Sequence, residues 1–403
     1  MTQQEFWRVP ETPARITDEH QALEAARAVA ALAATDAVKR DSERIYPQQA
    51  LALFSRLGLG SISVPQEYGG SGLPYRTVAE VFSLISAADP SLGQIPQNHF
   101  ALIQYLIDEG TEDQKRSLFS KVVAGYRIGN GGPEKGAKHT REVLARLHYT
   151  AEGPRLTGEK FYSTGALFAH IAATTAIDDH GKAVLAFIFL PTPGLQIVDD
   201  WSGMGQRTTA SGTMRLQQVA VDPLWLVDVP ATDKPSLRGP VSQLIQAAID
   251  AGIARGAFDE AREFITEQSR PWVDAGVARN ADDTQLQADV GRVYVGLLAA
   301  EALMRRAAGV LDSLGSTRPD AAAAAKASIA VAEAKVLTTA IALQVSEKLL
   351  EWGGSRSTLS RHGLDRHWRN ARTHTLHDPV RWKNYTLGNY YLNGVEPVRH
   401  TWI

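Results

Sequence analysis

The sequence pattern changes twice along this chain of 403 residues. Residues 1–125 and 234–403 carry long segments with helical periodicity, whereas residues 126–233 carry short runs of β-forming residues separated by Gly, Pro and Asp. This order predicts an α+β protein with an N-terminal α-helical domain (1–125), a middle antiparallel β domain (126–233) and a C-terminal α-helical bundle (234–403). The two changes of pattern therefore set the predicted domain boundaries.

Capping residues place several helix starts. Thr17 or Asp18 can cap the Ala-rich run 19–40, the pair Asp89-Pro90 combines a cap with a proline at the first helical position, and residues 111–114 (Thr-Glu-Asp-Gln) form a capping box. The C-terminal helices are expected at 240–268, 284–314, 319–352, 359–370 and 379–392. Small residues in the Ala-rich helix among them favour close packing in a bundle.

The middle region predicts at least six strands. They are expected at 146–151, 155–164, 171–177, 183–190, 195–199 and 213–221. Their short length, regular spacing and frequent alternation favour an antiparallel sandwich or barrel.

The composition narrows the class of protein. A hydrophobic content of 44%, a charged content of 21% and a net charge of −2 are typical of a globular protein and do not indicate nucleic-acid binding. The absence of cysteine excludes disulfides, thiolate nucleophiles and Cys-ligated metals. The polar N-terminus lacks the features of a signal peptide, and we expect no apolar run long enough to span a bilayer, so the sequence predicts a cytoplasmic protein without membrane contact.

Residues 353–385 concentrate potential chemistry. Four of the eleven histidines and six arginines fall in this stretch. His374 and His377 precede Asp378 and Pro379, which resemble an N-cap and a first helical residue. Imidazoles at a positive helix end, with arginines nearby, can hold an anionic or electron-rich cofactor and move protons at neutral pH. We therefore expect this segment to form one edge of an active site, with Asp378 acting either as a cap or beside the histidines.

Four segments, in the same order along the chain, resemble the acyl-CoA dehydrogenase superfamily. They are LGLGSISVPQEYGGSGLPY (57–75), GEKFYSTGA (158–166), MGQRTTASGTMRLQQVAV (204–221) and QVSEKLLEWGGSRST (344–358). Three further segments resemble its branch of reduced-flavin monooxygenases, which includes dibenzothiophene monooxygenases and sulfur-acquisition oxidoreductases. They are GQIPQNHF (93–100), SRPWVDAGVARNADD (269–283) and RNARTHTLHDPVRWK (369–383).

The resemblance implies a two-component monooxygenase that oxygenates a small organosulfur compound, or another heteroatom compound, through a C4a-(hydro)peroxyflavin. A dehydrogenase of the superfamily needs a carboxylate base, but the only acids between Gly353 and Pro379 are Asp365 and Asp378. The alternative position for a base, on an earlier helix, holds Gln246. An FAD-dependent acyl-CoA dehydrogenase stays the alternative, and a non-catalytic scaffold is a second one.

The same resemblance assigns candidate catalytic residues. His377 first and His374 second would hydrogen-bond the oxygenated flavin or relay protons. His99 and Asn98 match substrate-side residues, although His99 can equally be a core residue, and Gln94 stands where some relatives have a histidine. A metal held by His-x-x-His is not expected, because no third ligand stands at a recognisable spacing.

Cofactor residues are implied in two groups. Asn130, Tyr162, Ser163 and Trp201 would contact the flavin ring, with core packing as the alternative for the two aromatic residues; Arg270 and Arg356 would bind its phosphate, often across a subunit boundary, or else be surface arginines. An arginine in the Gly-rich segment favours FMN over FAD. Because no dinucleotide-binding motif is present, a separate flavin reductase would supply FMNH2. The resemblance also implies a homotetramer.

Overall fold

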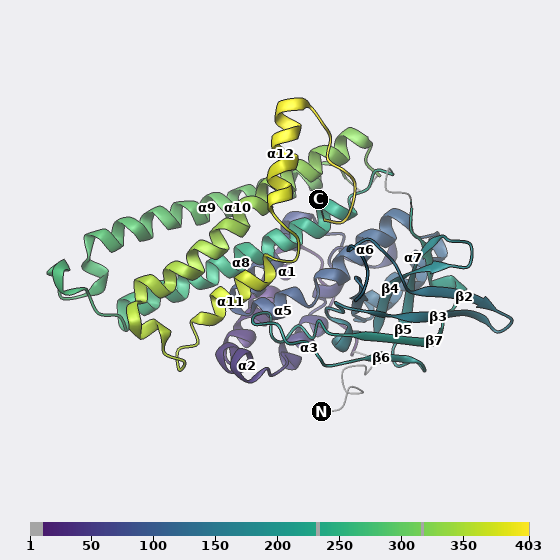
Figure 1. Ribbon diagram of the computed structural model, residues 1–403, viewed down its shortest axis with the longest axis horizontal. Helices are drawn as coiled ribbons and strands as arrows, with labels where there is room; N and C mark the ends of the chain where they lie inside the picture. Colours follow the sequence, from purple (N-terminus) through teal and green to yellow (C-terminus); the bar gives the residue numbers. More distant parts are fainter. Residues whose placement is uncertain (1–10, 231–233, 316–317, 403) are drawn as a thin grey trace.

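A computed structural model of the chain describes residues 11–230, 234–315 and 318–402. Figure 1 shows the long helices of the C-terminal part at one end, a β-sheet at the other, and the N-terminal helices between and beneath them. All described strands fall between residues 128 and 228, with helices on both sides in sequence. The boundaries at 125/126 and 233/234 stay predictions, and the second adjoins residues 231–233, which lie outside the described residues.

The described residues of the N-terminal part form seven α-helices. They are α1 Glu19–Ala34, α2 Ala37–Glu43, α3 Gln48–Arg56, α4 Tyr75–Ala88, α5 Pro90–Gln94, α6 Gln97–Glu109 and α7 Glu112–Val123. The predicted caps are present: the side chains of Asp18 and Asp89 accept from backbone amides of the first turn, and Thr111 closes a capping box. The single helix expected over 19–40 is instead broken into α1 and α2. Buried Arg40 donates to the carbonyl of Ala33 and pairs with Asp89, which offsets the break.

The middle part forms one eight-stranded sheet. Its strands are β1 Ile128–Gly131, β2 Arg146–Thr150, β3 Gly153–Lys160, β4 Ile171–Asp178, β5 Ala183–Phe189, β6 Leu195–Ile197, β7 Met214–Ala220 and β8 Leu226–Asp228. The order is β6-β7-β3-β2-β4-β5-β8, with β1 also paired to β4. Most pairs are antiparallel, as expected, but β4 pairs in parallel with both β1 and β2, so the sheet is mixed.

Two strands, β1 and β8, were not anticipated. The sequence of β1, Ile-Gly-Asn-Gly, resembles a loop. Its two glycines allow neighbouring segments to lie against the strand more closely than a side chain would permit. A Cβ at Gly129 would lie 2.5 Å from the backbone of Ala166, and one at Gly131 would lie 2.8 Å from Met214 Sδ. The strand therefore depends on tertiary neighbours that no local pattern reveals.

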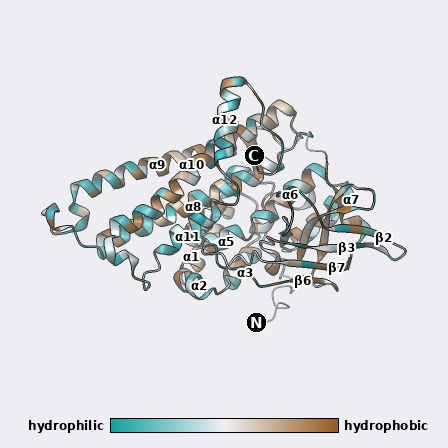
Figure 2. Ribbon diagram, in the orientation of Figure 1, coloured by the Kyte–Doolittle hydropathy of each residue, from teal (hydrophilic) through white to brown (hydrophobic). Residues whose placement is uncertain are grey.

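Five α-helices lie in the part of the C-terminal region that the structure describes. They are α8 Arg238–Glu267, α9 Thr284–Ser313, α10 Ala321–Gly353, α11 Asp365–His374 and α12 Arg381–Asn393. Small residues let the helices approach, as predicted. A Cβ at Gly252 of α8 would lie 2.4 Å from Ser83 O of α4, and one at Gly256 would lie 2.1 Å from Ala87 O. Figure 2 shows apolar residues recurring along α8, α9 and α10, while α12 projects from the bundle.

One helical segment of the described chain, Ala321–Thr358, is long and apolar enough to cross a membrane by length and composition alone. Its most apolar 18-residue stretch has a mean hydropathy of 1.4, and 67% of that stretch is buried within the protein. The core helix of a bundle meets the same criterion, and the buried ion pair that this helix carries belongs to the site described next.

Candidate active site

The turn between α5 and α6 connects the sheet with the bundle. Two side chains at the start of α6, directly after this turn, make the contacts. Gln97 Nε2 donates to Ser242 Oγ of α8 over 3.0 Å, and Asn98 Nδ2 donates to Asn130 Oδ1 of β1 over 2.9 Å. Gln94, the last residue of α5, lies against His374, the last residue of α11. The three parts of the fold therefore meet at residues 94–98.

A buried histidine–carboxylate pair lies on the bundle side of this turn. His374 Nδ1 lies 2.5 Å from Asp250 Oδ1, and the other carboxylate oxygen accepts from Lys335 Nζ over 2.6 Å and from Thr339 Oγ1 over 2.9 Å. The side chains of Asp250 and Lys335 are 0% and 1% exposed. Every described hydrogen-bonding partner of Asp250 is thus a donor, which suits an ionised carboxylate.

The electrostatics of this pair define the state of His374. Burial raises the pKa of Asp250, but the charge of Lys335 and the hydrogen bonds from His374 and Lys335 outweigh burial and lower it overall. Burial lowers the pKa of His374, and Asp250 only partly reverses this. We therefore assign a neutral ring that donates from Nδ1 to Asp250. Nε2 of this neutral ring carries only a lone pair and lies 3.0 Å from Gln94 Oε1, which is also an acceptor. We therefore assign the flipped orientation of the Gln94 amide, in which its NH2 group donates to Nε2.

A second histidine–carboxylate pair follows in the chain. His377 Nδ1 lies 3.1 Å from Asp378 Oδ1, and Lys383 Nζ lies 2.8 Å from Asp378 Oδ2, as an ion pair without hydrogen-bond alignment. The expected role of Asp378 as N-cap is wrong: α12 begins at Arg381 after Val380, and no side chain caps it. Asp378 pairs with His377 and Lys383 instead.

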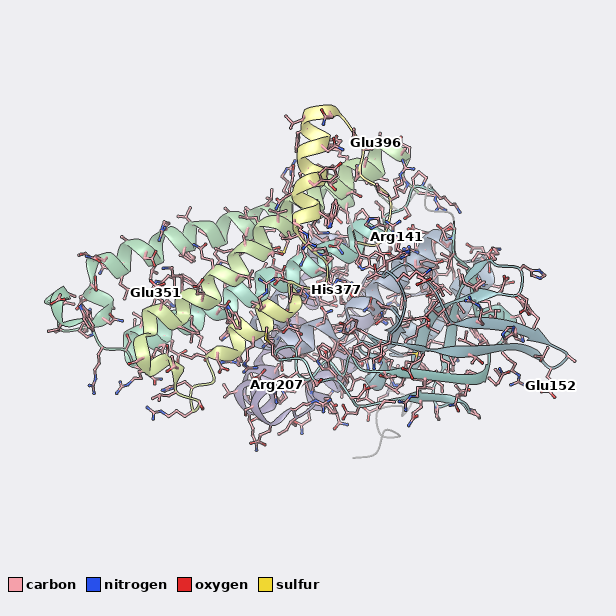
Figure 3. All side chains as sticks on the ribbon, in the orientation of Figure 1. Arg141, Glu152, Arg207, Glu351, His377 and Glu396 are labelled. Atoms are coloured by element: carbon pink, nitrogen blue, oxygen red, sulfur yellow. The ribbon has the colours of Figure 1, made fainter. Side chains whose placement is uncertain are left out.

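His377 is the accessible member of the two pairs. Its side chain is 35% exposed, whereas that of His374 is 1% exposed. Figure 3 labels His377 near the centre of the molecule, at the foot of α12. Burial raises the pKa of Asp378, but His377, Lys335 and Lys383 together hold it far below its usual range. A permanent carboxylate at Nδ1 fixes the orientation of the His377 ring, and Nε2 has no hydrogen-bonding partner among the described residues.

The residues predicted to contact a flavin ring lie on the sheet side. Ser163 Oγ donates to Gly212 O over 2.8 Å, and its segment reaches the α5–α6 turn, because a Cβ at Gly165 would lie 2.6 Å from Ile95 O. Tyr162 is 48% exposed and meets Trp201 edge to face, with ring centroids 5.8 Å apart. Tyr162 is therefore a surface aromatic, which contradicts the packing alternative for this residue, whereas Trp201 is half-buried and its Nε1 donates to Gln206 O over 2.8 Å.

His99 lies apart from this chemistry. Its Nε2 is 2.7 Å from Gly60 O, and its Nδ1 accepts from the amide of Ile128 over 3.1 Å. Burial lowers the pKa of His99 to about 4, so the ring is neutral. Because both nitrogens hold backbone groups, the structure supports the core alternative: His99 ties α6 to β1 and is not placed to donate protons.

The two predicted phosphate-binding arginines lie together, but far from the other site residues. Arg356 Nη1 donates to Gln268 O over 2.5 Å, and Arg270 follows two residues later, with no side-chain partner among the described residues. From Asp250 to Gln268, α8 rises about 27 Å, taking roughly 1.5 Å per residue. Figure 3 shows the same separation, with Glu351 of α10 well to the left of His377.

Several residues of the site were missed in the sequence. Asp250, Lys335 and Thr339 contact His374 or its partner carboxylate, yet each lies in an otherwise apolar stretch of α8 or α10. A charged residue inside an apolar helix was the available signal, because such a residue is almost never buried unless paired. No group of three or more His, Cys, Asp or Glu side chains in the described ranges is arranged to hold a metal ion.

Comparisons with known proteins agree with this architecture. The family model for the N-terminal domain of acyl-CoA dehydrogenases matches residues 17–126, and the one for their C-terminal domain matches residues 244–382. The dibenzothiophene monooxygenase of Rhodococcus erythropolis is 33% identical over 359 residues, covering 85% of this chain and 86% of the relative. SfnC of Pseudomonas putida, a probable FMNH2-dependent monooxygenase, is 30% identical over 388 residues, covering 94% of this chain and 97% of the relative.

A solved structure gives the same result for the fold. The FMN-bound crystal structure of TdsC from Paenibacillus sp. has a TM-score of 0.90 and 30% identity, covering 95% of this chain and 100% of that one. With its helical–β–helical order, its two matched domains and relatives that span nearly its whole length, the chain belongs to the acyl-CoA dehydrogenase family.

Proposed function

We propose that the protein is a two-component, FMNH2-dependent monooxygenase that oxygenates a small organosulfur compound. The observation that carries this proposal is the His377–Asp378 pair, in which the carboxylate holds Nδ1 of a partly exposed ring, so that Nε2 could accept and return a proton, and no free carboxylate base lies beside it. The relatives named as monooxygenases, and the FMN held by the similar structure, support the same reaction class.

The alternative of an acyl-CoA dehydrogenase is disfavoured by the same residues. Gln246, in the position for a base on α8, is a neutral amide. Asp365 is paired with Arg369 over 2.7 Å, and Asp378 is held by Lys383 with its pKa far below the usual range. A base needs a free lone pair and a pKa near the working pH, and neither carboxylate offers both.

The residues present fit FMN. Exposed Tyr162 and half-buried Trp201 offer apolar surface to a planar ring system, and Ser163 and Asn130 lie beside the α5–α6 turn with polar groups. Arg270 has an uncommitted guanidinium suited to a phosphate. Bound FMNH2 would supply two electrons and activate oxygen. Its source would be a separate flavin reductase.

We assign distinct roles to the protein side chains. His377 holds and moves a proton at Nε2 and is the catalytic candidate, whereas His374 is a positioning residue that acts through Gln94. Asn98 is committed to Asn130 and orients that amide from the substrate side. The buried charges around Asp250 fix this arrangement before any ligand binds.

The assembly follows from the separation of the two groups of cofactor residues. Arg270 and Arg356 lie at the C-terminal end of α8, about 27 Å along the helix from Asp250, whereas Ser163 lies near the α5–α6 turn, so a single FMN is not expected to reach both groups within one chain. We therefore propose a homotetramer in which one copy supplies the ring-binding residues and another supplies the arginines. We also propose that the enzyme works in the cytoplasm, without a membrane or nucleic acid partner.

Isotope incorporation tests the proposal. The protein is supplied with a flavin reductase, NADH, FMN and 18O2, together with a panel of thioethers, sulfoxides and sulfones. We expect one labelled oxygen atom per product molecule, and a loss of labelling in His377→Gln. Reduction of bound FAD by an acyl-CoA, with no label in any product, would instead establish the dehydrogenase.

A further inference from the structure

A cluster of buried amides between α6, α8 and the C-terminal tail has unused hydrogen-bonding capacity. The cluster consists of Gln97, Gln243 and Gln246, and none of these residues is more than 1% exposed. Gln97 Oε1, Gln243 Oε1 and both amide atoms of Gln246 are buried without a hydrogen-bond partner among the described residues. Four such atoms in one place need an explanation, since buried polar groups are nearly always paired.

The amide cluster lies beside the candidate active site. Gln246 stands one helical turn from Asp250, which holds His374, and one turn from Ser242, which accepts from Gln97 Nε2. Gln243 Nε2 donates to Thr401 O over 3.2 Å, so the C-terminal tail closes one side. The same tail contacts the second histidine pair, where Lys383 Nζ donates to Trp402 O over 2.9 Å. Gln246 therefore lies on α8 between Asp250 on one side and the Ser242–Gln97 contact on the other, one helical turn from each.

The energetics favour a ligand that satisfies these atoms. A buried polar atom left unpaired costs about 1–3 kcal/mol, so a flat apolar ligand placed against the cluster would leave a large penalty in place. The Gln246 amide offers two N–H donors, and the three carbonyl oxygens offer acceptors. The neighbouring cations Lys335 and Lys383 are committed to Asp250 and Asp378, so the cluster itself is neutral.

We infer that the amide cluster selects a substrate that already carries oxygen on sulfur, namely an uncharged sulfoxide, with the sulfone as its product. The Gln246 NH2 group would donate to the S=O oxygen, and the acceptors would hold water or polar C–H groups around it. This inference rests on the proposed function. With a sulfoxide R2SO, one atom of O2 joins sulfur to give R2SO2, and the other leaves as water with the two electrons and two protons of FMNH2.

The experiment compares three ligands that share one ring: tetrahydrothiophene, its sulfoxide and its sulfone. Calorimetry on the full-length protein, with and without oxidised FMN, measures their dissociation constants without any turnover. We expect the sulfoxide to bind at least about tenfold more tightly than the thioether, a fold-change set by one or two hydrogen bonds. Methanesulfinate and dibenzothiophene test an anion and a flat aromatic ligand.

Two variants connect the preference to the cluster. Gln246→Met keeps the length of the side chain and removes both unpartnered atoms, whereas Gln285→Met, at an exposed position of α9, is the matched control. We expect the preference for oxygenated ligands to vanish in Gln246→Met and to persist in Gln285→Met. Gln97→Met, which acts from the other side of the cluster, replaces Gln246→Met if thermal unfolding shows that variant to be misfolded.

Several outcomes would overturn the inference. They are equal affinity for thioether and sulfoxide, tighter binding of dibenzothiophene or methanesulfinate, no binding of any probe, and an undiminished preference in Gln246→Met. Because binding is measured without oxygen, a failure here is distinguishable from failure of the proposed function. Oxygen labelling without the ligand preference would refute only the amide cluster, and the preference without labelling would refute only the monooxygenase.

Discussion

Replacing Lys335 with Met should destabilise the protein strongly. Lys335 Nζ lies 2.6 Å from Asp250 Oδ2, and both side chains are at most 1% exposed. At an effective dielectric constant of about 20, two unit charges at this distance attract by roughly 6 kcal/mol. Part of that attraction offsets the desolvation of Lys335, which the variant no longer bears. Breaking a buried pair typically costs about 3–5 kcal/mol, so we expect a loss of about 4 kcal/mol.

The loss should depend on pH in a defined direction. Without Lys335, burial dominates and raises the pKa of Asp250 above its unfolded value. A carboxyl group with a raised folded pKa contributes stability below its unfolded pKa and loses it as the pH rises through the folded pKa. Lys335→Met should therefore be closer to wild type at mildly acidic pH than at pH 8.

Urea denaturation followed by circular dichroism measures this effect at both pH values. The double variant Lys335→Met/Asp250→Asn removes both charges, while the amide oxygen introduced by the second substitution can still accept from the Nδ1–H of His374. It should recover more than half of the lost stability, since no unpaired charge stays buried. A loss below about 1 kcal/mol in the single variant, or simple additivity in the double one, would refute a buried, coupled pair.

Three further predictions follow from the site. His377→Gln should lower oxygenated product per FMNH2 about 100-fold and raise hydrogen peroxide release, since it removes the accessible proton donor. The pKa of His99 is lowered to about 4, so between about pH 6.5 and 4 this residue takes up a proton only in the unfolded chain. The free energy of unfolding should therefore fall by roughly 3 kcal/mol across that range. In pH-dependent urea titrations, His99→Gln should flatten this profile. Arg270→Ala and Arg356→Ala should each weaken FMN binding about tenfold or more in fluorescence titrations, whereas exposed Arg262→Ala should not.

Each of these predictions has a contradicting result. Normal coupling of FMNH2 to product in His377→Gln would move the proton donor elsewhere. An unchanged pH profile in His99→Gln would show that other groups control acid unfolding. Equal effects of Arg262→Ala and Arg270→Ala would mean that general charge, and not a phosphate site, governs FMN affinity.

The order of the elements was predicted well because local signals specify it. Caps at Asp18, Asp89 and Thr111, together with the long apolar periodicity of α8–α10, depend on neighbouring residues alone. Strand β1 and the break between α1 and α2 were missed, because they depend on contacts with residues far along the chain. Local sequence signals predict helices and turns, but they do not predict the long-range contacts that break a helix or add a strand.

The candidate site was predicted in the same uneven way. His374 and His377 were recognised from their clustering, and the structure gives each a carboxylate partner. The partner of His374, Asp250, lies 124 residues away in sequence, and no spacing rule relates them. For His99 a substrate-side role and a core role were equally expected from the sequence, and its two backbone contacts support the core role.

The distance between Arg270 and Ser163 within one chain has a consequence for mixed assemblies. If each FMN site is formed by residues of two copies, then two impaired variants can complement one another in a mixed assembly. A chain with Arg270→Ala and a chain with His377→Gln carry their defects in different halves. Co-expressed with separate tags and purified through both, a mixed assembly would contain one intact and one doubly damaged site for each exchanging pair. Activity would then rise above that of the two impaired parents, in proportion to the fraction of mixed pairs.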